Sequence, residues 1–553
     1  MKLITSTQNL RRNIISFFLG LFLFSIMVFN TESVYAQFTV GNLVVEQIGD
    51  GSTTLGSAAT TVKLLQFTPT GTSATGTAFF GSTGTPTTSP FNIVDSGSAT
   101  SNGYISLSTD KTFVVIPGYN APNATASIAG SASATYGRTI GKVTYSGVLQ
   151  TNGTFNALTG NNYRSIASNG SSYYMAGGIG IVYTPNDATS NTTTTATSIF
   201  TTNTRILTIF NNTLFASTSS TSFNGTGSNL GIYQVGSFNS LPTATVTAGT
   251  AINIINTLTG SSPYGFAFSP DGLTCFVADD RATTAGGVQK WTYSGTFSNT
   301  TGWSGGTWSL AYTLGTGATN IGARGLSVDF SGTNPIIYGT SAESSLNRVF
   351  KITDTGASST ASTLVTATVN YIFRGICFAP QAPATISIAE GSNFNMAANI
   401  GSVSTQAITV SGSGLSSNIG LSFSGTDASL FSIDNNSLSQ TGGTATITFT
   451  PTSKGSFSAS LNLTSGATVL SVTLNGSSSG YTGISKTENS LKVTSEGNKL
   501  FFTSLLGDII EVYNSVGQKL VQKQAVEGLN IIPVLAKGVM LVKVGNRSAK
   551  VIL

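Results

Sequence analysis

The sequence predicts an all-β protein built from several domains. Three observations lead to this prediction: a length of 553 residues, 39% hydrophobic residues set among abundant Gly, Ser and Thr, and strand-turn-strand segments that recur along the chain. Charged residues make up only 8%, as in many disordered chains, but 32 Phe and 17 Tyr favour folded β-structure.

The net charge of +5 is concentrated at the two ends of the chain. Residues 1–36 hold three Lys/Arg against one Glu, and residues 480–553 hold nine Lys/Arg against five Asp/Glu. Residues 37–479 therefore carry a net charge of −1. Because no basic field extends across the main domains, we do not expect nucleic-acid binding.

The amino-terminal residues follow the pattern of an export signal. Arg11 and Arg12 precede an apolar run from Ile14 to Phe29, and a small residue, Ala36, stands before Gln37. The apolar run is short for a membrane span. We predict a signal peptide over residues 1–36, with an uncleaved anchor as the alternative. No later stretch is apolar enough to cross a bilayer, so we expect an exported protein without a transmembrane segment after signal cleavage.

Six segments between residues 37 and 383 resemble one another, and the clearest is SPYGFAFSPDGLTCFVADD, Ser262 to Asp280. Phe266 and Phe268 lie in its first apolar run, Pro270-Asp271-Gly272 is a turn sequence, and Leu273 to Ala278 is a second β-rich run. A hairpin alone is marginally stable, so each copy needs to be covered by other strands.

The spacing of these segments predicts a β-propeller. Equivalent positions are 60, 41, 60, 60 and 50 residues apart, which fits four-stranded blades. The last copy stops at Pro380 without a second strand, and strands after Gln37 can complete it. We predict six blades over residues 37–383; seven is the alternative, because residues 72–103 can hold a further degenerate unit. The equivalent positions are Ile105, Ser165, Ile206, Phe266, Leu326 and Ile376.

Residues 384–479 read as short alternating strands at regular spacing, which predicts a β-sandwich. The stretches SGSGL, DASLFSI and TFTPTSKGSFSASL resemble immunoglobulin-like modules of secreted proteins from Bacteroidetes-type bacteria. In those proteins the modules follow catalytic or binding domains and usually act as spacers. The resemblance therefore implies a spacer here and leaves the function open.

We expect a Gly/Ser linker at Gly476 to Gly480. The sequence of residues 480–553 predicts a second small β-sandwich. The strand pair IEVYNSVGQKL, the strand GVMLVKVG led by Gly538 and the Lys-rich end resemble the C-terminal sorting domain of type IX secretion substrates. The resemblance implies docking to the outer-membrane secretion machinery through residues 480–553, usually followed by cleavage. The Pro-Asn-Pro opening of many such domains is absent, and an ordinary sandwich without a sorting role is the alternative.

The residue types that are missing exclude several chemistries. The chain contains no histidine, which removes Ser-His-Asp and Cys-His catalysis and His-ligated zinc. Cys275 and Cys377 are too few for a cysteine-only zinc site. The repeat places Cys275 on the second strand of one blade and Cys377 on the first strand two blades further on, so we expect buried, unpaired thiols.

Acidic residues are sparse, and we assign no catalytic residue and no cofactor. Paired carboxylates from different blades could support hydrolysis at the ring axis. Asp271 belongs to a Pro-Asp-Gly turn, which explains it without catalysis. The adjacent Asp279 and Asp280 are a weak signal for a calcium site. The alternative is that both acids lie in a solvated loop. The visible acids are Asp271, Asp279, Asp280, Asp329 and Glu343.

Arginine precedes four of the six first strands. If the side chains point inward at one mouth of the channel, they form a cationic ring for carboxylate, sulfate or phosphate groups, for example of an acidic glycan. In the alternative, which we favour, each arginine pairs with a carbonyl or an acid of the neighbouring blade and locks the ring. The four residues are Arg164, Arg205, Arg324 and Arg374.

Two functions remain open. We prefer a secreted or cell-surface binding protein, in which a propeller presents loops or a channel mouth to a glycan, peptide or matrix component. The alternative is a secreted hydrolase or lyase that acts at the channel mouth with carboxylate or metal chemistry.

Overall fold

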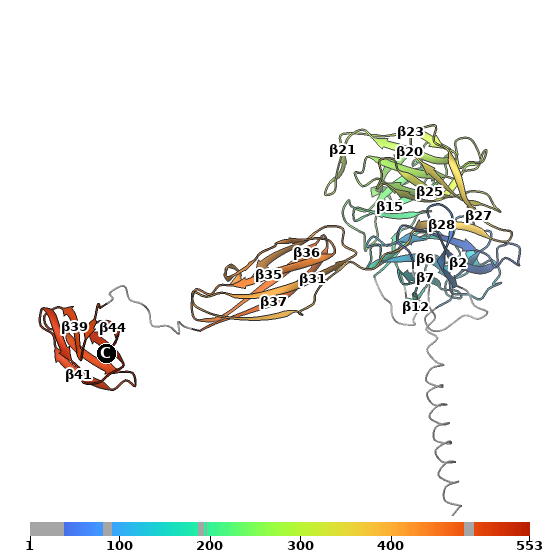
Figure 1. Cartoon of the computed structure of the whole chain (residues 1–553). Coiled ribbons are helices and arrows are strands. Elements are labelled where there is room, and N and C mark those ends of the chain that lie inside the picture. Colours follow the sequence, from blue (N-terminus) through green and yellow to red (C-terminus); the bar gives the residue numbers. More distant parts are fainter. Residues whose placement is uncertain (1–37, 81–90, 186–192, 195, 480–490) are drawn as a thin grey trace, which may run out of the picture. The chain divides into compact units, whose positions relative to one another are not determined.

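The computed structural model describes residues 38–80, 91–185, 193–194, 196–479 and 491–553. The predicted signal peptide, residues 1–36, lies outside these residues. The chain divides into two compact units, residues 1–383 and 384–553, which are described separately. Both are built of β-strands, as predicted, with three short 3-10 turns at Ile128–Gly130, Ala248–Thr250 and Ala428–Leu430 (Figure 1). Within the described ranges, no helix has the length and apolarity needed to span a membrane.

Four successive segments of the first unit each form an antiparallel four-stranded sheet. Strand order follows the chain in every one of them. The strands are β9 (Tyr163–Ser168), β10 (Ser172–Gly177), β11 (Gly180–Pro185) and β13 (Thr197–Phe200); β14 (Leu207–Phe210), β15 (Thr213–Thr218), β16 (Gly231–Val235) and β17 (Ile252–Asn256); β18 (Pro263–Phe268), β19 (Thr274–Asp279), β20 (Gly287–Tyr293) and β23 (Trp308–Leu314); and β24 (Ala323–Asp329), β25 (Ile336–Ser341), β26 (Arg348–Thr353) and β27 (Ala361–Thr366).

A larger sheet joins the two ends of the first unit. Its first named strand along the chain pairs antiparallel with its last, so that Val44 lies opposite Cys377. The strands that follow Gln37 thus complete the sheet that begins with FRGICFAP. The strands are β1 (Leu43–Ile48), β2 (Ala59–Phe67), β3 (Ser73–Phe80), β4 (Val94–Ser96), β5 (Ser106–Leu107), β6 (Phe113–Tyr119), β7 (Arg138–Thr144), β8 (Leu149–Phe155), β12 (Thr193–Thr194) and β28 (Ile372–Phe378).

The strands that carry the six predicted repeats contact one another in a closed cycle. β5 contacts β9, β9 contacts β14, β14 contacts β18, β18 contacts β24, β24 contacts β28, and β28 contacts β5. Apolar side chains fill the space between successive sheets; one such layer contains Phe215, Ile232, Phe266 and Trp291. The predicted hairpins therefore pack through their first strands.

The turn of the clearest repeat forms as its sequence predicts. The carboxylate of Asp271 accepts a hydrogen bond from the backbone N–H of Leu273 at 3.0 Å, and the N–H of Ser269 donates to the carbonyl of Thr274 at 2.8 Å. Gly272 has φ +69°, a conformation that glycine adopts without steric cost. The interpretation of Asp271 as a turn residue is confirmed.

Residues 384–479 form a β-sandwich whose two sheets share one apolar core, with Ile408 and Ile447 from one sheet and Leu461 and Leu474 from the other. One sheet contains β29 (Thr385–Ile388), β31 (Ser404–Ser413), β35 (Gly442–Phe449) and β33 (Phe431–Ile433); the other contains β30 (Asn393–Asn399), β37 (Thr468–Ser479), β36 (Gly455–Ser465), β32 (Ile419–Ser424) and β34 (Ser437–Leu438).

The prediction of a linker at Gly476 to Gly480 is wrong for residues 476–479. These residues form the end of β37, which pairs in parallel with β30. A Cβ on Gly476 would lie 2.5 Å from the ring of Phe449, so glycine here allows a core ring to pack against the strand. The Gly/Ser composition that suggested a linker reflects close packing. Residue 480 lies outside the described residues.

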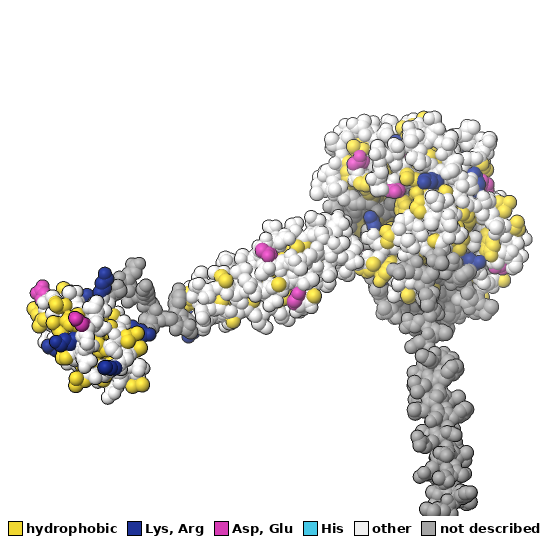
Figure 2. Space-filling view, viewed as in Figure 1, with side chains coloured by type: hydrophobic (Ala, Val, Ile, Leu, Met, Phe, Trp, Pro, Cys, Tyr) yellow, Lys and Arg dark blue, Asp and Glu magenta, His cyan; other side chains and the backbone are white. Residues whose placement is uncertain are grey.

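Residues 491–553 form a smaller sandwich around Leu500, Phe502, Ile510, Val512 and Val542. Apolar side chains also lie on its surface, where Figure 2 shows them beside Lys and Arg. Its sheets consist of β38 (Thr494–Glu496), β39 (Lys499–Ser504) and β42 (Gly528–Pro533), and of β41 (Lys519–Gln524), β40 (Ile509–Asn514), β43 (Val539–Val544) and β44 (Arg547–Ile552).

Candidate functional site

A cavity of about 310 Å³ lies among the first strands of the sheets in the first unit. We call it the central cavity. Its volume is at the lower end of the range for small-molecule sites, roughly 300–1,000 Å³. None of its lining residues is charged, and most are apolar. The lining comes from β5, β14, β18, β24 and β28 and their flanking residues: 104–107, 206–210, 265–268, 325–328, 330 and 375–378.

Three glycines at equivalent repeat positions bring these strands close together. A Cβ on Gly265 would lie 2.8 Å from the carbonyl oxygen of Arg324, and one on Gly325 would lie 2.6 Å from that of Arg374. A Cβ on Gly375 would clash with the backbone of Ile105. Sequence reasoning missed these glycines, although the recurring YGF, RGL and RGI stretches carried the signal.

A phenylalanine lies at the carboxyl-terminal end of four of the lining segments. Phe210, Phe268, Phe330 and Phe378 all line the central cavity. A polar groove of about 520 Å³ shares Leu107, Ile209 and Phe210 with the cavity and adds Lys111 and three asparagines. The cavity and this groove together offer an apolar pocket next to hydrogen-bonding groups. The asparagines are Asn169, Asn211 and Asn212.

Two tyrosines lie at the amino-terminal ends of the lining segments. The rings of Tyr104 and Tyr264 are buried, with centroids 5.6 Å apart. The guanidinium groups of Arg205 and Arg324 lie 4.2 and 5.8 Å from the ring of Tyr264. Burial raises the pKa of Tyr104 well above its usual value. All four predicted site residues therefore gather near these rings, since Arg374 acts electrostatically on Tyr104 and Arg164 interacts electrostatically with both tyrosines.

Arg164 and Arg205 each donate to the segment that leads into the next sheet. Arg164 Nη1 donates to the carbonyl of Thr204 at 2.9 Å and to the side-chain oxygen of Asn203 at 2.5 Å. Arg205 Nη1 donates to the hydroxyl of Ser262 at 2.7 Å. Both arginines thus connect neighbouring sheets.

Arg324 and Arg374 also have protein partners. Arg324 Nε donates at 3.1 Å to a carboxylate oxygen of Asp280, which directly follows β19 of the preceding sheet. Arg374 is 1% exposed and donates from Nη2 to the carbonyl of Gly97 at 3.0 Å, while its Nε and Nη1 have no hydrogen-bond partner. Burial lowers the pKa of Arg374. None of the four arginines lines the central cavity.

Two buried carboxylates lie near Arg374, and sequence reasoning did not single them out. Glu46 is fully buried on β1, and neither carboxylate oxygen has a hydrogen-bond partner. Asp95 on β4 accepts hydrogen bonds from Asn102 Nδ2 at 2.8 Å and from the N–H of Ser96 at 2.7 Å. Burial raises the pKa of Asp95 to about 7, and burial together with the Asp95 charge raises the pKa of Glu46.

The five acids considered from the sequence are all engaged by other groups. None of them lines the central cavity. Among the described residues, no group of three or more Asp, Glu or Cys is arranged to hold a metal ion. Asp271 accepts from the N–H of Leu273, Asp329 accepts from the N–H of Ser331, and Asp279, Asp280 and Glu343 pair with Arg281, Arg324 and Arg348.

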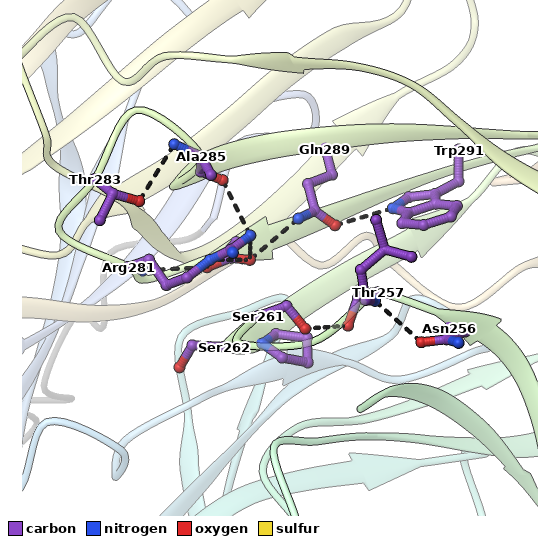
Figure 3. A network of polar contacts seen from close by, with 12 residues as sticks. Asn256, Thr257, Ser261, Ser262, Arg281, Thr283, Ala285, Gln289 and Trp291 are labelled. Carbon is purple, nitrogen blue, oxygen red and sulfur yellow. Dashed lines mark hydrogen bonds and ion pairs between the residues drawn. The ribbon is translucent and has the colours of Figure 1, made fainter. Parts of the chain in front are cut away.

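A polar network that includes Arg281, Gln289 and Trp291 is shown in Figure 3, and the buried Asp279 accepts its central hydrogen bonds. Arg281 donates to both of its carboxylate oxygens, from Nε at 2.9 and 3.0 Å and from Nη2 at 2.7 Å. Gln289 Nε2 donates to it at 3.1 Å, and Trp291 Nε1 donates to the side-chain oxygen of Gln289 at 3.0 Å. The network ties β19, its following loop and β20 together.

The two thiols are buried and unpaired, as predicted. Cys275 lies on β19, the second strand of its sheet, and Cys377 lies on β28. Burial raises the pKa of both thiols. They are therefore protonated at physiological pH and unreactive as nucleophiles.

Comparison with known proteins adds only distant similarities. No protein-family model and no curated protein matches the sequence. The extracellular domain of a two-component system from B. thetaiotaomicron aligns with a TM-score of 0.32 at 11% identity, over 80% of this chain and 60% of that chain. Domains 4 and 5 of the S-layer protein SbsC align with a TM-score of 0.14 at 14% identity, over 23% of this chain and 64% of that chain.

Two domains of titin, solved in complex with telethonin, align with a TM-score of 0.17 at 14% identity, over 30% of this chain and 95% of that chain. Of the extracellular domain of the two-component system, the chain spans about 60% of the length. The functional argument therefore rests on the residues of this chain.

Proposed function

We propose that the first unit is a six-bladed β-propeller. The cyclic contacts among β5, β9, β14, β18, β24 and β28 support this arrangement. The sheet β28-β1-β2-β3 supplies a blade closed by strands from both ends of the unit. Six is favoured over seven because residues 72–103 contribute β3 and β4 to the larger sheet.

We propose that this propeller belongs to a secreted or cell-surface binding protein without catalytic activity. The observation that carries the proposal is the central cavity, a preformed apolar site of about 310 Å³ that is bordered by five of the six cyclic strands. Such a cavity suits an apolar side chain of a peptide or protein ligand, and the adjoining groove with Lys111 and its asparagines suits the polar backbone.

The alternative, a hydrolase or lyase, requires acids that converge on a substrate. Three of the five acids are held by arginines, and two cap turns. Neither Glu46 nor Asp95, the buried pair, lines the cavity. These positions favour binding over catalysis.

Filling the central cavity tests the binding proposal. Ala267 lines the cavity, and Ala267→Phe adds an aromatic ring inside it. Peptides are selected on the full chain from a displayed random library, and their affinities are compared among wild type, Ala267→Phe and the control Ala282→Phe in an exposed loop. We expect at least tenfold weaker binding to Ala267→Phe alone. Unchanged affinity for Ala267→Phe, or the absence of any selected peptide, overturns the proposal.

We further propose that residues 480–553 direct export by the type IX route and that residues 384–479 act as a spacer. The resemblance of IEVYNSVGQKL and GVMLVKVG to sorting domains supports this role. Surface residues support it as well: Leu529 and Ile531 are 59% and 47% exposed on β42, an apolar pair available for docking.

A truncated chain tests the export proposal. A chain that ends at Ser479 keeps both preceding folds and lacks the proposed sorting domain. In a producing bacterium with a type IX system, we expect the full chain at the surface or in the medium and the truncated chain in the periplasm. Equal export of both chains contradicts the sorting role.

A further inference from the structure

A second cleft, of about 340 Å³, lies between the outer strands of two neighbouring sheets. We call it the rim cleft. β17 is the last strand of one sheet and β23 is the last strand of the next, and the two strands are in contact. The rim cleft shares no lining residue with the central cavity. It is therefore a separate site, and it goes beyond the function proposed above.

Three partly exposed aromatic rings line the rim cleft. The ring of Trp308 lies 5.8 Å from that of Trp303 and 5.4 Å from that of Tyr293, at interplanar angles of 65° and 47°. Trp303 Nε1 donates to the carbonyl of Gly272 at 2.6 Å, and the hydroxyl of Tyr293 accepts from the N–H of Gly306 at 3.1 Å. The rings are thus fixed in place before any ligand arrives.

The hairpin formed by β21 (Thr296–Ser298) and β22 (Gly302–Ser304) supplies Trp303. Phe297 of this hairpin packs 5.0 Å from Trp303, and the side-chain amide of Asn211 donates to the carbonyl of Asn299 at 2.5 Å. The hairpin is an insertion between β20 and β23 that no other sheet of the unit shows among its described strands. The cleft is therefore a local addition to one sheet.

Polar groups on the other side of the cleft are uncharged. Asn253 makes only long hydrogen bonds, at 3.3 and 3.4 Å, and Asn256 uses its side-chain oxygen to accept from the N–H of Leu258 at 3.0 Å. Thr307 is exposed, and Trp308 Nε1 is buried without a hydrogen-bond partner. None of the eight lining residues is charged.

We propose that the rim cleft binds an uncharged oligosaccharide. A sugar ring has an apolar C–H face, which stacks on aromatic rings such as Trp303 and Trp308, and a polar edge of hydroxyls, which bind amides such as Asn253. A charged sugar would lose hydration without gaining a partner of opposite charge. The rigid rings limit the entropy lost on binding.

Calorimetric titration of the full chain tests the proposal. The probes are five neutral oligosaccharides, the hexamers of β-1,4-glucose, β-1,3-glucose, β-1,4-xylose, β-1,4-mannose and N-acetylglucosamine, with oligogalacturonate as the charged comparison. We expect saturable binding of at least one neutral probe. Thr307→Trp fills the cleft from an exposed position, and Trp308→Phe keeps a ring but removes the N–H. We expect at least tenfold weaker binding to Thr307→Trp and a smaller loss for Trp308→Phe.

Two controls separate this site from the central cavity and from misfolding. Ala267 and Ala282 do not line the rim cleft, so Ala267→Phe and Ala282→Trp should bind the oligosaccharide as wild type does. Melting temperatures show whether each variant is folded. The proposal is overturned if no neutral probe binds saturably, if only oligogalacturonate binds, or if folded Thr307→Trp keeps wild-type affinity. Capture of peptides instead of saccharides at this cleft also overturns it.

Discussion

The ring of Tyr264 lies under the guanidinium of Arg205 at 4.2 Å and beside the ring of Tyr104 at 5.6 Å. Tyr104 precedes the first of the cyclic strands, whereas Tyr264 belongs to β18. Arg324 lies 5.8 Å from the same Tyr264 ring. One aromatic side chain thus contacts side chains from three other strand segments, at the amino-terminal ends of the strands that line the central cavity.

Removing this ring should destabilise the first unit strongly. Tyr264 is 3% exposed, and we expect Tyr264→Ala to cost about 3–5 kcal/mol, because it leaves a cavity and removes two cation–π contacts. Tyr264→Phe keeps the ring and should stay close to wild type. Differential scanning calorimetry measures the transition of the first unit. A melting temperature of Tyr264→Ala equal to that of Tyr264→Phe would contradict this role.

Asp95 should make the first unit more stable in mild acid. Burial raises its folded pKa from 3.8 to about 7, so between these values the folded protein holds a proton that the unfolded chain releases. The free energy of unfolding should therefore fall as pH rises from about 4 to about 7, by on the order of 3 kcal/mol, and then level off. Glu46, whose pKa is also raised, adds a change of the same sign.

Asp95→Asn provides the matched test of this pH dependence. The amide oxygen still accepts from Asn102 and Ser96, but it does not titrate. We expect this variant to be more stable than wild type at pH 8, equal to it near pH 4, and flatter between the two. Urea unfolding across this pH range gives the comparison. Equal slopes for variant and wild type would show that Asp95 does not titrate as described.

The arginines should contribute to stability more than to anion binding. At pH 8, where Asp95 is mostly ionised, Arg374→Met leaves this buried carboxylate without its cation, and we expect a loss of about 3–5 kcal/mol. Arg324→Ala removes a partly exposed pair with Asp280, for which about 1 kcal/mol is expected. Sulfate and oligogalacturonate should raise the melting temperatures of wild type and Arg324→Ala equally. A ligand-induced rise seen only in wild type would instead support the cationic ring.

The thiols should resist modification in the folded protein. Cys275 and Cys377 are 0% and 6% exposed, and burial raises the pKa of both. With a thiol-reactive chromophore we expect no labelling of the native chain and two labels per chain in denaturant. Fast labelling under native conditions would show that β19 or β28 opens.

Local sequence patterns predicted much of the fold. The turn at Asp271, the strands around Phe266 and the completion of β28 by β1 follow from short-range chemistry and from counting strands. These features depend on residues close in sequence or on a repeat. The linker prediction failed because Gly476 is explained by the Phe449 ring, a contact between residues that only the sandwich brings together.

The candidate sites were harder to predict. Trp303 comes from the β21-β22 hairpin, Trp308 from β23 and Asn253 from β17 of the neighbouring sheet, and no spacing in the chain places them side by side. Glu46 and Asp95 were missed because each stands alone in an ordinary strand sequence. Their burial and their shared neighbour Arg374 arise only when the two ends of the first unit meet.

The pairing of β1 with β28 also determines the order of events when the protein is made. Leu43 lies opposite Phe67 of β2 on one side and opposite Phe378 of β28 on the other, so one edge of β1 has no partner until 335 further residues have been synthesised. A contact of such long range forms slowly. Until then this edge of β1 is open to pairing with another chain. A chaperone that covers this edge would therefore protect newly made chains from misassembly until the last strand arrives.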